Sequence, residues 1–177
     1  EIVSLSQNAE LRIKEGKDSY ISQSGNYVRE GVIYQPNKDA QILLIRNSPL
    51  LDINLAKEAV KVHRENKEYS ISEELVKEYS EKSSEEQNSE VFPLTNLEAI
   101  VANKFSKDKR ALWLFQDQAE NYGKFLYDKG IKEMPLWFND EDYINSQKSP
   151  FVNQLWLHGL GDWSFLFGCG SNLVGGN

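Results

Sequence analysis

Short apolar runs separated by turn residues occupy the first quarter of the chain and predict β-strands. The runs Glu1–Leu5, Tyr27–Tyr34 and Gln41–Arg46 are rich in Val, Ile, Tyr and Leu, which favour extended backbone. The turn residues around them are Gly16, Gly25 and Pro36. Because Ile42–Ile45 is continuously apolar, we expect this strand to be buried on both faces.

Helical spacing of apolar residues follows in the next part of the chain. Asp52 precedes the stretch Ile53–Asn66, and its carboxylate can cap the N-terminus of a helix. The side chains expected on the buried face of this helix are those of Leu55, Ala56, Ala59, Val60 and His63. Ser70 and Glu73 have the spacing of a capping box, which predicts a second helix through Tyr79.

Two further helices are predicted in the middle of the chain. Thr95 and Glu98 again have capping-box spacing, so we expect a helix to begin at Thr95. The stretch Lys107–Asp128 predicts one long helix, which Gly130 can end. Its apolar face would consist of Ala111, Phe115, Ala119, Tyr122 and Leu126.

The remaining patterns complete an α+β reading. Ser83–Glu90 is acidic and of low complexity, which predicts a solvated loop. Met134–Phe138 predicts a buried strand with Pro135 at its beginning. With strands and helices mixed along 177 residues, we expect one domain that spans residues 1–177.

Composition narrows the classes of function. The chain has 40% hydrophobic and 27% charged residues and no apolar run long enough to span a bilayer. Its formal net charge of −7 argues against general nucleic-acid binding, which needs clustered Lys and Arg. The first residues do not show the charged-then-apolar pattern of a signal peptide, so we read no targeting signal.

Candidate metal and cofactor chemistry is sparse. Cys169 is the single cysteine, which excludes an internal disulfide framework and a cysteine-cluster metal site. The run Asn139–Asp142 offers oxygen donors, but it lacks the glycine and the distal glutamate of an EF-hand loop. We interpret it as a solvated turn and expect no metal and no cofactor.

The C-terminal segment, about residues 155–177, alternates between two sets of residues, and Lys148 is the last Lys, Arg or Glu of the chain. The frame residues are Leu155, Trp156, Leu157, Leu160, Trp163, Ser164, Leu166, Gly168 and Leu173. The interleaved residues are His158, Gly159, Gly161, Asp162, Phe165, Phe167, Cys169, Gly170, Ser171, Asn172, Val174, Gly175, Gly176 and Asn177. A glycine-rich tail is usually flexible, but the aromatic content here is too high for a solvated tail.

The interleaved residues share a property of the genetic code. Each of their types can be reached from the asparagine codon AAC by changing only adenines, whereas Lys, Glu, Gln, Met and Trp cannot. The frame types Leu, Trp, Ser and Gly all have codons without adenine. The alternation therefore predicts adenine-directed hypermutation of the interleaved positions.

This segment resembles the variable region of diversity-generating retroelement variable proteins, including those of archaeal viruses. The stretch Phe92–Ile100 is also similar to the Leu-Pro-Thr, Glu, large-apolar element of their fold, the C-type lectin fold of the formylglycine-generating-enzyme type. It departs from that element in that Pro93 precedes Leu94, at Phe92, where arginine is usual, and at Ala99-Ile100, where tryptophan is common. The resemblance covers residues 92–177 best and implies a hypervariable protein that binds a receptor or ligand on a virion or cell surface.

The resemblance also implies which residues form the site. The expected ligand-binding residues are His158, Gly159, Gly161, Asp162, Phe165, Phe167, Cys169, Gly170, Ser171, Asn172 and Val174. Among them, Phe165 and Phe167 would be the anchors, and polar neighbours would supply hydrogen bonds. The partner would be an unidentified protein or surface ligand.

Two alternatives belong to other classes. Leu157–Asp162 is similar to the oxyanion-hole segment of α/β-hydrolases, but no G-x-S-x-G motif and no histidine follows it, so we expect no enzyme. A pair of Cys169 with His63 or His158 has no orienting partner in the sequence. The second alternative is a structural or assembly module, in which the aromatic C-terminal segment would be covered in an oligomer.

Overall fold

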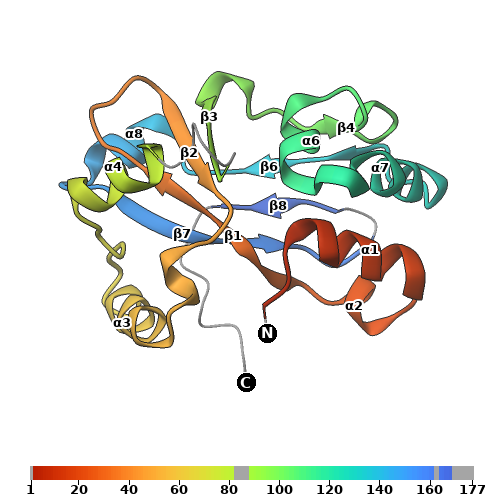
Figure 1. Cartoon of the computed structure of the whole chain (residues 1–177), viewed down its shortest axis with the longest axis horizontal. Helices are drawn as coiled ribbons and strands as arrows, with labels where there is room; N and C mark the ends of the chain where they lie inside the picture. Colours follow the sequence, from red (N-terminus) through yellow and green to blue (C-terminus); the bar gives the residue numbers. More distant parts are fainter. Residues whose placement is uncertain (1, 82–87, 162–163, 169–177) are drawn as a thin grey trace. The chain divides into compact units, whose positions relative to one another are not determined.

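The computed structural model describes residues 2–81, 88–161 and 164–168 (Figure 1). The helices are α1 (Leu5–Glu15), α2 (Tyr20–Gln23), α3 (Ile53–His63), α4 (Glu73–Glu81), α6 (Lys109–Phe115), α7 (Ala119–Asp128) and α8 (Glu141–Ser146). The strands are β1 (Asn26–Tyr34), β2 (Gln41–Ile45), β3 (Ser89–Pro93), β4 (Ile100–Val101), β5 (Glu133–Met134), β6 (Leu136–Trp137), β7 (Phe151–Leu157) and β8 (Leu166–Phe167). Short 3-10 turns are η1 (Pro49–Leu51), η2 (Leu94–Asn96), η3 (Ala102–Lys104) and η4 (Gln116–Gln118). This mixture confirms the α+β class.

The chain divides into two compact units, each built from segments far apart in sequence. The first unit consists of Glu1–Val28, Glu98–Trp137 and Trp156–Phe167. The second unit consists of Arg29–Leu97, Phe138–Leu155 and Gly168–Asn177. The expected binding residues that the structure describes therefore belong to the first unit.

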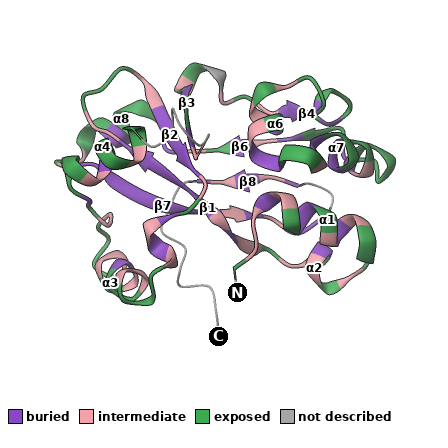
Figure 2. Ribbon diagram, viewed as in Figure 1, coloured by how far each residue is buried: buried purple, intermediate pink, exposed green. Residues whose placement is uncertain are grey.

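The second unit is organised around strands β3, β2, β1 and β7, which are neighbours in that order. β2 pairs antiparallel with both β1 and β3, with Leu44 opposite Val32 and Ile42 opposite Phe92. Figure 2 shows buried residues over much of β2 and β7. Residues 42–45 are at most 2% exposed, which confirms the strand that was expected to be buried on both faces.

Helices α3 and α4 supply apolar side chains to this core. Ala59 of α3 and Val76 of α4 pack with Ile33, Leu43 and Val152 of the strands. Burying such side chains is the main favourable contribution to folding.

The expected cap of α3 is confirmed, whereas that of α4 is wrong. The Asp52 carboxylate accepts hydrogen bonds from the backbone N–H groups of Asn54 and Leu55, as expected. In α4 the capping residue is Ser72, which accepts from the Leu75 N–H, and not Ser70.

The acidic run Ser83–Glu90 does not remain a loop to its end, because Ser89 and Glu90 pair with β2 as the start of β3. Residues 82–87 lie outside the described residues.

The first unit contains a helical core and the short strands. The end of β7 pairs with β8, and β8 pairs with β6, while β4 pairs with β5. Phe105, Phe115 and Tyr122 meet ring to ring between the helices, with 4.9 Å between the centroids of Phe115 and Tyr122. Aromatic contacts of this kind stabilise a core beyond the area that they bury.

The N-terminal segment is helical, and the strand expected over Glu1–Leu5 is wrong. Ser4 caps α1 by accepting a hydrogen bond from the Gln7 N–H, and the Gln7 side chain accepts one from the Ser4 N–H. This reciprocal pair satisfies donors that a helix start leaves free. The apolar residues Leu5 and Ala9 are then buried as one face of a helix.

The helix expected over Lys107–Asp128 is interrupted. Gln116 has a φ of 51°, a left-handed value that a right-handed helix does not accommodate, and α6 ends there. A 3-10 turn, η4, leads into α7. Gly130, with a φ of 83°, follows α7 as the expected stop.

No α-helix begins at Thr95. The chain instead forms the 3-10 turn η2, and Ile100 and Val101 then pair with Met134 and Glu133 as β4. The next α-helix along the chain is α6. Its cap is Asp108, which accepts from the backbone N–H groups of Arg110 and Ala111.

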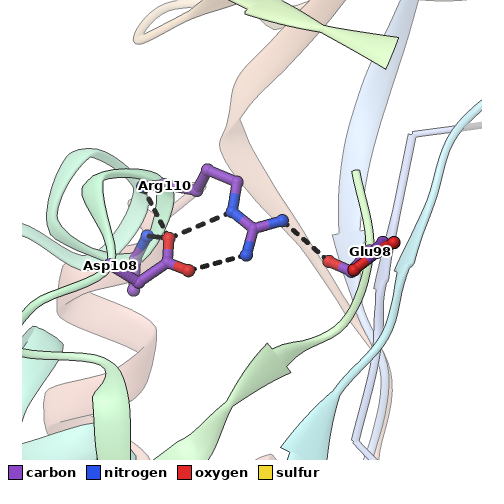
Figure 3. A network of polar contacts seen from close by, with 4 residues as sticks. Glu98, Asp108 and Arg110 are labelled. Atoms are coloured by element: carbon purple, nitrogen blue, oxygen red, sulfur yellow. Dashed lines mark hydrogen bonds and ion pairs between the residues drawn. The ribbon is translucent and has the colours of Figure 1, made fainter. Parts of the chain in front are cut away.

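The Asp108 carboxylate is also paired with the Arg110 guanidinium (Figure 3). The nearest approach is 2.6 Å, and Arg110 Nη1 donates to the Glu98 carbonyl oxygen at 2.9 Å. Burial would raise the pKa of Asp108, but the hydrogen bonds and charge of Arg110, together with the backbone donors, lower it below its ordinary value.

The strand expected over Met134–Phe138 is divided at Pro135 into β5 and β6, which pair with different strands. It is not buried throughout, because Trp137 is 47% exposed.

Within residues 2–81, 88–161 and 164–168, no helix has the length and apolar character needed to cross a membrane.

Candidate ligand-binding site

The site is built on the alternation of side chains along β6, β7 and β8. Leu157 lies opposite Leu166, and Leu166 lies opposite Leu136. Partners across a sheet point to the same side, so these three leucines form one row. Leu157 and Leu166 are fully buried and Leu136 is 7% exposed, which places this row in the core.

The neighbouring row has the opposite character. Trp156 lies opposite Phe167, and Phe167 lies opposite Trp137. Because successive strand residues alternate between faces, these three rings point away from the leucines. Trp137 is 47% exposed, and the other two are partly buried.

His158 directly follows β7 and Phe165 directly precedes β8. By strand alternation they are the next outward residues after Trp156 and Phe167, so they extend the outer row. The His158 N–H donates to the Phe165 carbonyl oxygen at 2.9 Å, which continues the pairing of β7 with β8. The two side-chain rings stack with their centroids 4.0 Å apart. Both residues are partly buried.

These five rings form one connected cluster, which we call the aromatic face: Trp137, Trp156, His158, Phe165 and Phe167. Trp137 stacks on Phe165 at 4.7 Å and meets Phe167 edge-on at 4.9 Å. Trp156 contacts both His158 and Phe167 at 5.2 Å, and Phe165 meets Phe167 edge-on at 4.6 Å. Stacked and edge-to-face arrangements are those that aromatic quadrupoles favour.

The structure thus brings together three of the expected ligand-binding residues, His158, Phe165 and Phe167. Their side chains are only partly exposed, because the rings pack on one another and on two tryptophans. The frame leucines behave as expected: Leu155, Leu157, Leu160 and Leu166 are all fully buried. Ser164 and Gly168 are buried as well.

Trp137 and Trp156 are members of the face that the sequence reasoning did not assign to it. Trp156 was expected in the frame and Trp137 in a buried strand. The signal was present as strand alternation, because each tryptophan adjoins a leucine that points inward. Partly exposed tryptophans are frequent energetic centres of binding sites.

The His158 imidazole has a defined orientation. Its Nδ1 lies 2.8 Å from the Gly159 carbonyl oxygen. A carbonyl oxygen only accepts, so Nδ1 carries the proton, and Nε2 of the neutral ring is an acceptor. His158 can therefore offer a directional hydrogen bond in addition to its ring surface.

The two expected glycines that the structure describes differ from each other. Gly161 is exposed, and a Cβ added there would meet nothing within 4 Å, which suits an exchangeable position. Gly159 is buried, and a Cβ there would overlap the Gln23 carbonyl group. Gly159 thus departs from the expected pattern of exposed interleaved side chains because the chain passes directly against α2.

The remaining expected binding residues are Asp162, Cys169, Gly170, Ser171, Asn172 and Val174, which lie outside the described residues, as do the frame residues Trp163 and Leu173. Their assignment stays a prediction.

The backbone that leads into this part of the chain is fixed in the second unit. The buried Tyr34 hydroxyl donates to the Gly168 carbonyl oxygen at 2.6 Å, and the Asn153 amide donates to the same oxygen at 3.3 Å. A Cβ at Gly168 would overlap the Phe138 ring.

Among the described residues, no group of three or more His, Cys, Asp and Glu side chains is placed to hold a metal ion. The run Asn139–Asp142, interpreted as a solvated turn, leads into α8: Asp140 caps this helix by accepting from the Tyr143 N–H at 2.7 Å.

Comparison with known proteins identifies the fold. No family model matches the chain, and no curated protein matches its sequence. A solved structure described as "Accommodation of massive sequence variation in Nanoarchaeota by the C-type lectin fold" is similar, with a TM-score of 0.67 and 9% sequence identity. The match covers 96% of this chain and 82% of that chain. The chain therefore has the C-type lectin fold, which confirms the expectation for the fold.

Proposed function

We propose that this C-type lectin fold carries a hypervariable ligand-binding site that a diversity-generating retroelement diversifies. The aromatic face and the interleaved residues of the segment 155–177 form the site. The protein would act at the surface of a virion or cell, bind a protein or another surface ligand, and catalyse no reaction.

One observation carries this proposal: the two rows of side chains on β6, β7 and β8 differ in burial and in residue type. The inner row, with Leu157 and Leu166, is fully buried. The outer row, with His158, Phe165 and Phe167, contains residue types that adenine changes in AAC codons produce. Exchange of the outer side chains leaves the inner packing in place, which is the property that a diversified scaffold needs.

The structural neighbour supports the proposal at the level of the fold. It is a protein of Nanoarchaeota described as accommodating massive sequence variation. The same backbone arrangement is therefore compatible with extensive exchange of side chains.

The test is the DNA that flanks the gene. We expect a near-copy of the codons for residues 155–177 with adenines at the interleaved codons, and a reverse-transcriptase gene close to it. Absence of both from the flanking DNA contradicts diversification.

An assembly module is the second candidate, because the 47% exposed Trp137 could be covered by another copy of the chain. Sedimentation of the purified protein separates the two candidates. A stable oligomer that Trp137→Ser dissociates favours assembly, whereas a monomer favours a face that is free for ligand.

A further inference from the structure

Arg12 is a fully buried arginine, and three of its four hydrogen-bond acceptors lie at least 110 positions away in the sequence. It belongs to α1, and its relative exposure is 0%. Nη1 donates to the His158 carbonyl oxygen at 2.8 Å and to the Tyr122 hydroxyl at 3.3 Å. Nη2 donates to the carbonyl oxygens of Ser24 at 3.2 Å and Leu157 at 3.4 Å.

Three of these four acceptors are main-chain carbonyl groups, those of Ser24, Leu157 and His158. Leu157 and His158 are consecutive residues at the end of β7, where the chain carries His158 onto the face. Ser24 precedes Gly25, and a Cβ at Gly25 would overlap the Trp156 ring. One guanidinium therefore fixes both the backbone that carries His158 and the loop on which Trp156 packs.

The chemistry of the contact matters for a site whose side chains are exchanged. A guanidinium holds several donors in a rigid planar fork, and hydrogen bonds from a charged donor are stronger than neutral ones. Every residue type offers the same main-chain carbonyl as an acceptor. The contact with residue 158 therefore does not depend on the side chain at that position.

We propose that Arg12 is a positioning residue of the aromatic face. It fixes the backbone of residue 158 through the carbonyl group, and so orients whichever side chain stands there, the His158 ring in this chain. The relevance of this role to binding rests on the proposed function, but the role itself is a property of the free protein. A purely structural arginine would stabilise the fold without setting the geometry of the rings.

The first experiment compares Arg12→Lys with Tyr122→Phe. Lysine keeps the charge but offers a single ammonium in place of the fork, so it cannot reach all four acceptors. Tyr122→Phe removes one acceptor of the same guanidinium and leaves the three carbonyl contacts. We expect Arg12→Lys to remain folded and to lose the nuclear Overhauser contacts between the rings of His158 and Phe165, while Tyr122→Phe retains them. A folded Arg12→Lys variant with these contacts unchanged overturns the proposal.

The second experiment keeps Arg12 and changes residue 158, so it does not depend on whether arginine variants fold. Buried guanidinium protons exchange slowly enough with water to be followed by NMR. In His158→Asn, His158→Ser and His158→Tyr, we expect the Arg12 Nη proton signals to persist with shifts close to those of the wild type. Their loss in any of these three folded variants overturns independence from the side chain.

Neither measurement uses a ligand, so the two proposals can fail separately. If the flanking DNA lacks a template while both NMR results hold, the proposed function fails and the positioning role stands. If the ring contacts survive in folded Arg12→Lys, the positioning role fails and the proposed function is unaffected.

Discussion

The imidazole of His158 stacks on the ring of Phe165 with 4.0 Å between the ring centroids and 28° between the ring planes. The same two residues are joined by a backbone hydrogen bond from the His158 N–H to the Phe165 carbonyl oxygen. Because both the backbone and the rings of this pair are in contact, the two rings keep one orientation. Because a rigid surface loses little conformational entropy on binding, this pair is well suited to contact a ligand.

The inner row should control stability. Leu166 is fully buried, and Leu166→Ala is expected to lower the free energy of unfolding by roughly 2–5 kcal/mol, as large-to-small core changes do. The matched control is Leu112→Ala, at a leucine that is 43% exposed, where a change of about 0.5 kcal/mol is expected. Urea denaturation of both variants measures the difference. Equal losses would contradict the assignment of Leu166 to the core.

The outer row should control binding. Phe165→Ala together with Phe167→Ala removes the ring contacts that these residues make within the aromatic face. Because the buried leucines of the inner row stay in place, the double variant is expected to remain folded. Binding to the cognate ligand should fall by roughly 2 kcal/mol for each anchor. Denaturation and a binding titration on the same double variant separate the two effects. A double variant that unfolds means that these rings belong to the core.

The same titration extends to Ser171 and Asn172, the two polar residues expected to join the phenylalanines on the face. A quadruple alanine variant should remain folded, because none of the four side chains belongs to the buried inner row of leucines. Retained binding by this variant would remove the four residues from the site.

Gly25 should matter through the tryptophan that it touches. Gly25→Ala places a Cβ where the Trp156 ring lies, so the ring must move or the loop must shift, at a cost of about 1–3 kcal/mol. Gly161→Ala is the matched control, because nothing lies within 4 Å of the added Cβ. We expect a change of tryptophan fluorescence in Gly25→Ala alone. An unchanged spectrum in both variants would show that Trp156 does not rest on Gly25.

The Asp108–Arg110 pair should contribute an acid-sensitive part of the stability. The pKa of Asp108 is lowered in the folded protein, so the folded state favours the ionised carboxylate. The stabilisation is complete above the unfolded pKa, about 3.9, and is lost as the pH falls through the folded pKa. The urea midpoint of the wild type should therefore drop more between pH 7 and pH 3 than that of Asp108→Asn.

A second variant checks the cause of this pH dependence. Arg110→Gln removes the charge and the guanidinium donors that lower the pKa of Asp108. Its urea midpoint should also fall less with acid than that of the wild type. A wild-type slope in both variants would assign the acid sensitivity to other groups.

The sequence carried enough information for the strands β1 and β2, the helix capped by Asp52, and the inward leucines of the C-terminal segment. These features depend on local periodicity and on caps within a few residues. Thr95 and Glu98 show the limit of such signals, because their capping-box spacing is present but the chain continues into β4, which pairs with a strand more than thirty residues away.

Long-range contacts explain most of what was missed. Arg12 contacts the His158 carbonyl 146 positions later, and no local pattern marks it. The left-handed backbone of Gln116 gave no signal either, because glutamine is a good helix former. Ser4 and Gln7 have the spacing of a capping box, but the apolar residues next to them favour a strand on local pattern alone.

The opposite orientation of adjacent side chains in β7 and β8 also offers a plan for protein engineering. A combinatorial library restricted to positions 158, 165 and 167 would leave Leu157, Leu166 and the strand pairing unaltered in every clone. Most members of such a library should then fold, and selection against a chosen target would sample recognition without first discarding misfolded clones. Codons confined to the outward positions would make this chain a small scaffold for artificial binders.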